Sequence, residues 1–159
     1  MFQNTNEECF SSAGKMVDTG IDISSISTKL FQQKTLASIK LDALAAERMT
    51  LLNGGKIVLS TLSQEDIDSV GGTNADTEDC INVIRSLKGS LIACILKERN
   101  GGVRGSLRSK DGTNVAAIAA EFGGGGHAAA AGFTLECSLE DAVDIVTKRL
   151  CSIDLGDAS

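Results

Sequence analysis

The sequence predicts an α/β domain with a mixed β-sheet, flanked by helices and preceded by a helical linker segment. Strand-length apolar runs at residues 57–62 and 91–96 alternate with stretches in which apolar residues recur at helical spacing. Asn53-Gly54, just before the first run, is a common hairpin turn and predicts that residues 51–52 pair with it. The run at 91–96 contains no polar alternation, which indicates a strand buried on both faces.

Helices are expected before the sheet. Residues 9–17 have a weak helical period, and Gly20 suits the position just after a helix C-terminus. Residues 24–49 form the longest periodic stretch, and a break around residues 32–35 indicates a kink or a turn between two helices. This stretch is either a connection between domains or a helix packed on the core, and both readings stay open.

Further helices are expected within and after the sheet, at residues 80–87, 115–122 and 138–150. The last begins with acidic residues and ends with basic ones, which suits the helix dipole. The predicted organisation is a helical segment at 1–50, an α/β domain at 51–151 and a frayed tail at 152–159.

Composition narrows the classes of function. Of the 159 residues, 42% are apolar and 23% are charged, as in an ordinary globular protein. No apolar stretch is long enough for a membrane span, and the polar N-terminus is not a signal peptide. The five cysteines are scattered and there is one histidine, which argues against a disulfide framework or a zinc site and for reduced thiols in the cytoplasm. The net charge of −6 disfavours the coating of long polyanions, but a local pocket for a small phosphorylated ligand remains compatible with it.

A run of glycines precedes the only histidine of the chain: Gly123, Gly124, Gly125, Gly126 and His127. Alanines follow, and alanine is the best helix former, so we expect a glycine loop that leads into the N-terminus of a short helix. Such a loop presents backbone N–H groups to a phosphate or carboxylate. The alternative is a flexible linker. The apolar residues on both sides of the run disfavour a linker.

Residues 103–110 predict a strand, and its period of two gathers polar side chains on one face: Arg104, Ser106, Arg108 and Lys110. The guanidinium of Arg108 suits a phosphate or carboxylate, and the hydroxyls of Ser106 and Ser109 are donors. If the next helix returns the chain to the same sheet edge, this face and the glycine loop form one phosphate site. The alternative is a solvated charged face. No set of aspartates and histidines for a metal and no Ser/His/Asp set is visible, so we expect binding residues and no catalytic ones.

Two motifs in this region carry a family resemblance. They are Ser106–Lys110 (SLRSK) and Phe122–His127 (FGGGGH), the second continued by Ala130–Phe133 (AAGF). Around them, residues 76–150 resemble the C-terminal DHH-associated domain of DHH-family phosphoesterases, in particular the NrnA-like group of oligoribonucleases and phosphoadenosine-phosphate (pAp) phosphatases. In that family an N-terminal DHH domain holds manganese and performs hydrolysis, while the associated domain binds the nucleotide.

The resemblance implies a fragment that binds pAp or short oligonucleotides and is inactive alone. It implies no cofactor in this chain, with Mn²⁺ held by a missing DHH domain of the same parent protein. The implied substrate-binding residues are Arg104, Ser106, Arg108, Ser109, Gly123, Gly124, Gly125, Gly126 and His127. Gly105, where an apolar residue is usual, and Ala128-Ala129 depart from the family pattern and leave the substrate preference open.

Two other functions remain open at this point. One is a stand-alone RNA-binding module of the type appended to alanyl-tRNA synthetase. The other is a structural domain that oligomerises through residues 24–49, and a homodimer is compatible with either reading.

Overall fold

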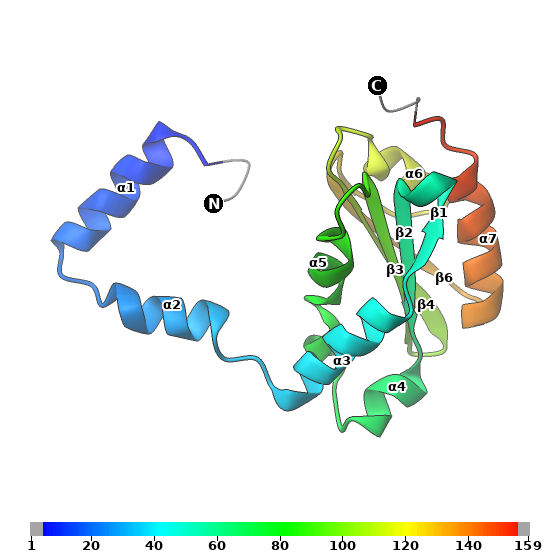
Figure 1. Ribbon diagram of the computed structural model, residues 1–159, viewed down its shortest axis with the longest axis horizontal. Coiled ribbons are helices and arrows are strands. Elements are labelled where there is room, and N and C mark those ends of the chain that lie inside the picture. Colours follow the sequence, from blue (N-terminus) through cyan, green and yellow to red (C-terminus); the bar gives the residue numbers. More distant parts are fainter. Residues whose placement is uncertain (1–4, 156–159) are drawn as a thin grey trace. The chain divides into compact units, whose positions relative to one another are not determined.

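The computed structural model describes residues 5–155 and confirms the predicted α/β fold with a mixed sheet (Figure 1). The chain divides into two compact units, one up to Lys34 and the other from Thr35 onward. The predicted break in the long helical stretch coincides with this division, because α2 ends at Phe31 and Thr35 caps the next helix.

The first unit contains two amphipathic helices, α1 (Glu7–Asp18) and α2 (Ile23–Phe31). Each begins at a side-chain cap, since Asn6 and Asp22 accept hydrogen bonds from backbone N–H groups of the first turn. Gly20 between the helices has a φ of +81°, the conformation that its predicted place after α1 requires. Neither helix has a buried residue.

The second unit contains the sheet. Its elements in chain order are α3 (Leu36–Glu47), β1 (Thr50–Leu52), η1 (Asn53–Gly55), β2 (Ile57–Leu62), α4 (Gln64–Ser69), η2 (Asn74–Thr77), α5 (Cys80–Arg85), β3 (Ile92–Arg99), β4 (Gly102–Ser109), α6 (Val115–Glu121), β5 (Gly125–His127), β6 (Ala130–Leu135) and α7 (Leu139–Cys151). The strand order is β1-β2-β3-β4-β6-β5. β2 and β3 run parallel, joined by a crossover that contains α4 and α5, and the other neighbours are antiparallel.

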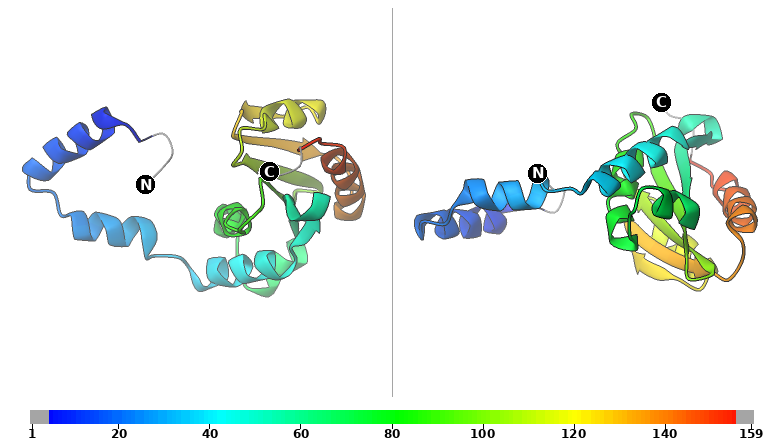
Figure 2. Two further views of the ribbon diagram at one scale, coloured as in Figure 1. Left: turned by 45° about the horizontal axis from the view of Figure 1, so that its top comes forward. Right: turned by 90° about the horizontal axis from the view of Figure 1, so that it is seen from below.

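Helices pack on both faces of this sheet (Figure 2). On one face, α6 and α7 cover a core that runs from β2 to β6 and includes the fully buried Leu107 and Phe133. On the other face, α3, α4 and α5 cover a second core over β2 and β3, with Leu41 and Ala45 of α3 fully buried. The C-terminal part of the stretch 24–49 is therefore a core helix of the second unit.

The hairpin at Asn53-Gly54 is confirmed. β1 and β2 pair in antiparallel fashion, and Asn53 adopts a φ of +48° in the turn. The Asn53 side chain also donates to the carbonyls of Leu150 and Ile153, at 3.4 and 3.2 Å. This turn residue therefore anchors the end of α7 to the sheet.

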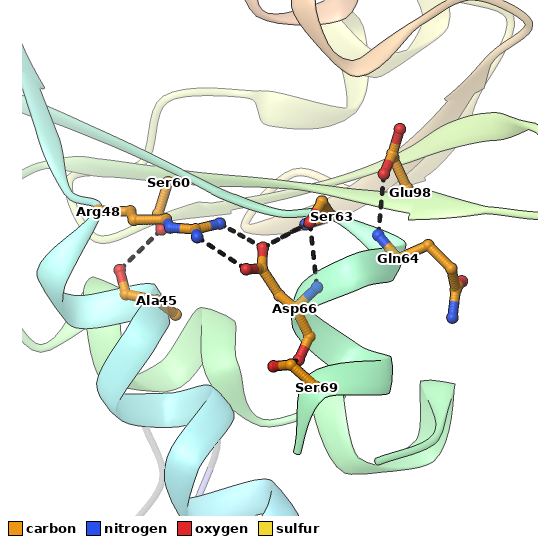
Figure 3. A network of polar contacts seen from close by, with 8 residues as sticks. All are labelled: Ala45, Arg48, Ser60, Ser63, Gln64, Asp66, Ser69 and Glu98. Carbon is orange, nitrogen blue, oxygen red and sulfur yellow. Dashed lines mark hydrogen bonds and ion pairs between the residues drawn. The ribbon is translucent and has the colours of Figure 1, made fainter. Parts of the chain in front are cut away.

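A polar network joins α3 to the start of α4 (Figure 3). Arg48, at the end of α3, forms an ion pair with Asp66 and donates from Nη2 to Oδ1 at 2.7 Å. Asp66 also closes a capping box with Ser63, whose side chain accepts from the Asp66 backbone. On the other side, the buried hydroxyl of Ser60 donates to the Ala45 carbonyl at 2.7 Å. These contacts fix α3 against β2.

One prediction is wrong. The alanine run does not form a helix; together with the glycines it forms the antiparallel hairpin β5–β6, in which His127 pairs with Ala130. Pairing of β6 with β4 outweighs the helical preference of alanine, which is only a weak bias. The helix next to the glycines is α6, and it ends there instead of beginning. No helix N-terminus is therefore available to bind an anion at this place.

No helix in the described part of the chain is long and apolar enough to cross a membrane.

Candidate functional site

Strands β4, β6 and β5 bring most of the predicted binding residues to one face of the sheet. Cross-strand pairing aligns Arg108 with Ala130, and Ala130 with His127. The next row consists of Ser106, Gly132 and Gly125. Paired residues of neighbouring strands point to the same side, so both rows lie on one face. The cationic strand and the glycine segment thus meet on one surface, as the sequence predicts.

The half of this face that β4, β6 and β5 form is open, because the helices on that side pack their apolar side chains on β2 and β3. The apolar cluster beneath α3, α4 and α5 takes its sheet residues from β2 and β3, for example Val58 and Ile95. Within residues 5–155, that cluster has no member from β4, β6 or β5. The open half forms a pocket of about 320 Å³, at the small end of the range for small-molecule sites.

Four cations and one carboxylate line this pocket: Lys97, Arg99, Arg104, Arg108 and Glu78. Its floor has little side-chain bulk, since Gly125, Gly132 and Ala130 lie there beside Ser106. We call this arrangement the cationic pocket. Positive charge above nearly bare backbone suits a phosphate or another small anion.

The sequence motifs do not identify three of these residues as part of a site, namely Lys97, Arg99 and Glu78. The apolar run that predicts this strand ends at residue 96, but β3 continues to Arg99, and the turn is confined to Asn100 and Gly101. The signal was present, because a period of two from the buried Ile95 places Lys97 and Arg99 on the face of Arg104. Glu78 comes from another segment, and no local pattern relates it to the strand.

Lys97 is the most deeply placed cation. Its ammonium donates to the carbonyl and hydroxyl of Thr77, at 3.3 and 3.0 Å, and its side chain is only 9% exposed. Burial lowers the pKa of Lys97, and the charge of Glu78, 3.7 Å from Nζ, opposes that shift. The group is therefore held in one position with its charge turned toward the pocket.

The two arginines of β4 are held more loosely. Arg108 donates from Nη1 to the Leu107 carbonyl at 2.9 Å, and Arg104 reaches the Thr134 hydroxyl at 3.4 Å. Burial lowers the pKa of Arg108, the charge of Arg85 adds to this, and Glu78 opposes it. Within residues 5–155, neither arginine has a carboxylate within ion-pair distance, so both guanidinium groups are available to an anion.

Backbone conformation and close packing explain three of the four glycines, Gly123, Gly124 and Gly126. Gly123 has a φ of +72°, and its N–H bonds the Ala120 carbonyl in the turn that ends α6. A Cβ on Gly124 would lie 2.2 Å from the Gly132 carbonyl oxygen, and one on Gly126 would lie 2.5 Å from that of Ala130. Of the four glycines, only Gly125 lines the cationic pocket.

Gly105, the unusual residue of β4, is also explained by packing. A Cβ there would lie 2.2 Å from the ring of Phe133, the residue that it pairs with on β6. The buried ring fills the space that a larger side chain at position 105 would take.

The other predicted residues lie outside the pocket lining. His127 is exposed and is on the same face as Arg108, two strands away, or about 10 Å between backbones. Ser109 points to the opposite, buried face and donates to Asp111 at 2.9 Å. Lys110 donates to the Leu87 carbonyl and the Ser90 hydroxyl, both at 2.9 Å. The structure thus brings Arg104, Ser106, Arg108 and Gly125 together and leaves Ser109 apart.

Within residues 5–155, no group of three or more His, Cys, Asp or Glu side chains could hold a metal ion. The site that the described residues form is a cationic pocket on the open face of a mixed sheet.

The comparison with protein families gives this site a context. The model of the DHHA1 domain matches residues 54–151, which is more than half of the chain. The chain belongs to the DHHA1 domain family. The match includes β2 to α7 and the whole cationic pocket.

Relatives support the same assignment. The chain is 30% identical over 135 residues to the bifunctional oligoribonuclease and PAP phosphatase NrnA of Thermus thermophilus, covering 85% of this chain and 40% of that protein. The Bacillus subtilis protein of the same name is 22% identical, with 85% and 42% covered. A solved structure of an exopolyphosphatase-related protein from Bacteroides fragilis is 25% identical and has a TM-score of 0.87, covering 94% of this chain and 44% of that one. The chain thus spans about two-fifths of the length of the curated relatives that it matches.

Proposed function

We propose that the chain binds the phosphate groups of a nucleotide such as pAp, or of a short oligonucleotide, in the cationic pocket. The observation that carries this proposal is the cross-strand pairing of β4, β6 and β5. It places Arg104, Ser106 and Arg108 side by side over a floor of glycine and alanine. The names of the NrnA relatives, an oligoribonuclease and PAP phosphatase, make nucleotides the first ligands to test.

We further propose that this pocket presents the substrate to a catalytic DHH domain of the same parent protein. Mn²⁺ would belong to that domain, because the described residues form no ligand set for a metal. Exposed apolar side chains on α1 and α2, among them Phe10, Met16, Leu30 and Phe31, are consistent with coverage by further polypeptide. On this proposal the chain alone binds substrate without hydrolysing it, and its free cysteines agree with a location in the reducing cytoplasm.

The test is a calorimetric titration of the chain with pAp at low salt. Arg108→Ala should weaken binding by tenfold or more, since a charge-assisted contact contributes about 1.5–3 kcal/mol. Lys148→Ala is the matched control, because it removes one exposed positive charge from α7, on the opposite face of the sheet. Equal affinity of the two variants, or no binding by the wild type, would overturn the proposal.

Two further assays separate the alternatives. Incubation with Mn²⁺ and pAp should release no phosphate, and robust turnover by the pure chain would contradict a binding role alone. Titration with a long RNA should give little signal even at low salt because the chain is acidic. Tight, salt-sensitive binding there would favour the RNA-binding module instead.

A further inference from the structure

The cationic pocket contains one carboxylate, that of Glu78, to which the proposed function gives no role. Glu78 lies between η2 and α5, and its side chain is 67% exposed. Its Oε1 is 3.7 Å from Lys97 Nζ, which is an ion-pair distance but longer than a direct hydrogen bond. Two segments distant in sequence thus place a negative charge beside a site for anions.

The two members of this ion pair are held very differently. Two hydrogen bonds to Thr77 fix the ammonium of Lys97, whose side chain is almost wholly buried. Glu78 is exposed, and within residues 5–155 the 3.7 Å ion pair with Lys97 is its one such contact. The ammonium is therefore a fixed feature of the pocket, and the carboxylate is its solvent-exposed partner.

Glu78 also influences the second strand of the pocket. Its charge favours the ionised form of Arg108 on β4, against the effects of burial and of Arg85. The carboxylate thus offsets part of the positive potential that both β3 and β4 offer to a ligand. An anion in the pocket meets this negative charge wherever it lies between Lys97 and Arg108.

We propose that Glu78 sets the charge selectivity of the cationic pocket. The repulsion between Glu78 and a ligand grows in proportion to the ligand charge. A phosphodiester carries one negative charge, whereas a terminal phosphate monoester carries nearly two above its second pKa of about 6. Glu78 therefore disfavours terminal monoesters more than internal diesters. It thereby reduces the preference for the more highly charged monoester that the cations alone would give. This inference rests on the proposed function of the pocket.

The experiment compares two ligands that differ by one charge, adenosine 5′-monophosphate (AMP) and its phosphate methyl ester, at pH 8 and low salt. Glu78→Gln should strengthen binding of the methyl ester about threefold and of AMP about tenfold, because doubling the ligand charge squares the factor. Glu78→Asp keeps the charge and should keep the ratio of the wild type. Glu140→Gln removes the same charge from the exposed start of α7 and should change neither affinity.

Each outcome has a distinct meaning. The inference is supported if Glu78→Gln, and neither of the other two variants, gains more affinity for AMP than for the methyl ester. Equal gains for both ligands, or gains matched by Glu140→Gln, would overturn it while Arg108→Ala still reports on the pocket. If neither the wild type nor Glu78→Gln binds either ligand, the proposed function fails and the inference fails with it.

Discussion

Replacement of Gly105 by alanine tests whether β4 and β6 pack as described. Gly105 lies on the buried side of β4, and an added Cβ would lie 2.2, 2.4 and 2.6 Å from three ring atoms of Phe133. Phe133 is fully buried, and its ring contacts that of Phe122 at a centroid distance of 4.7 Å. The ring is therefore enclosed by the core, and the added methyl group must shift either the ring and its neighbours or the strand.

The cost follows from two opposing effects. Overpacking a core by one methyl group typically costs about 1–3 kcal/mol. Alanine recovers roughly 0.5–1 kcal/mol because glycine loses more backbone entropy on folding. This clash is far inside van der Waals contact, so the upper part of the range applies. We expect Gly105→Ala to lower the free energy of unfolding of the second unit by about 2 kcal/mol.

Urea unfolding followed by far-UV circular dichroism measures this change, because the chain has no Trp or Tyr for fluorescence. Hydrogen exchange of peptides from β4 and β6 assigns the loss to the second unit. Gly125→Ala is the control, since its Cβ would have no neighbour within 4 Å, and its stability should stay within about 0.5 kcal/mol of wild type. In a Phe133→Leu background, Gly105→Ala should cost less. Equal stability of Gly105→Ala and Gly125→Ala, or an unchanged cost in that background, would refute the packing described here.

Three further predictions concern stability and reactivity. Burial would raise the pKa of Asp66, but hydrogen bonds from Arg48 and Ser63 outweigh it and hold that pKa below its usual range. Ionised Asp66 thus stabilises the fold above its unfolded pKa, and the gain is lost as pH falls through the folded pKa. Urea titrations should show Asp66→Asn about 2 kcal/mol less stable than wild type at neutral pH, with the gap closing below about pH 4; a gap independent of pH would contradict this. Asn53→Ala should be less stable than Asn53→Gly by roughly 1 kcal/mol, because only glycine accepts the positive φ without strain, and equal urea midpoints would argue against that strain. Burial raises the pKa of the Cys94 thiol to about 12. Mass spectrometry after iodoacetamide treatment at pH 8 should therefore find exposed Cys151 alkylated and Cys94 unmodified until urea is added. Labelling of Cys94 before urea is added would show that the core opens.

The strands with simple patterns could be predicted from sequence. The alternation of β4 identifies both its buried residues and the face of Arg104 and Arg108, because a period of two follows from strand geometry alone. The turn at Asn53 was equally local, since few residues tolerate a positive φ.

The sequence predictions fail where long-range contacts determine the local structure. Propensity alone predicts a helix for the alanine run, but pairing with β4 and the tight backbone contacts of Gly124 and Gly126 make it a hairpin. Lys97 and Arg99 are not recognised as strand residues, because charged residues seldom continue a buried strand. The open half of the sheet depends on where α3, α4 and α5 end, which no local pattern encodes.

β4 carries apolar core residues on one side and the arginines of the cationic pocket on the other. A slip of its pairing by a single residue would exchange the two sets, forcing Arg104 and Arg108 into the core and turning Val103 and Leu107 toward water. Misregistered molecules would lose the packed interior and the anion site together. If the cationic pocket binds phosphate as proposed, retention on an immobilised phosphate ligand would select correctly folded molecules from a refolding mixture or a library of variants.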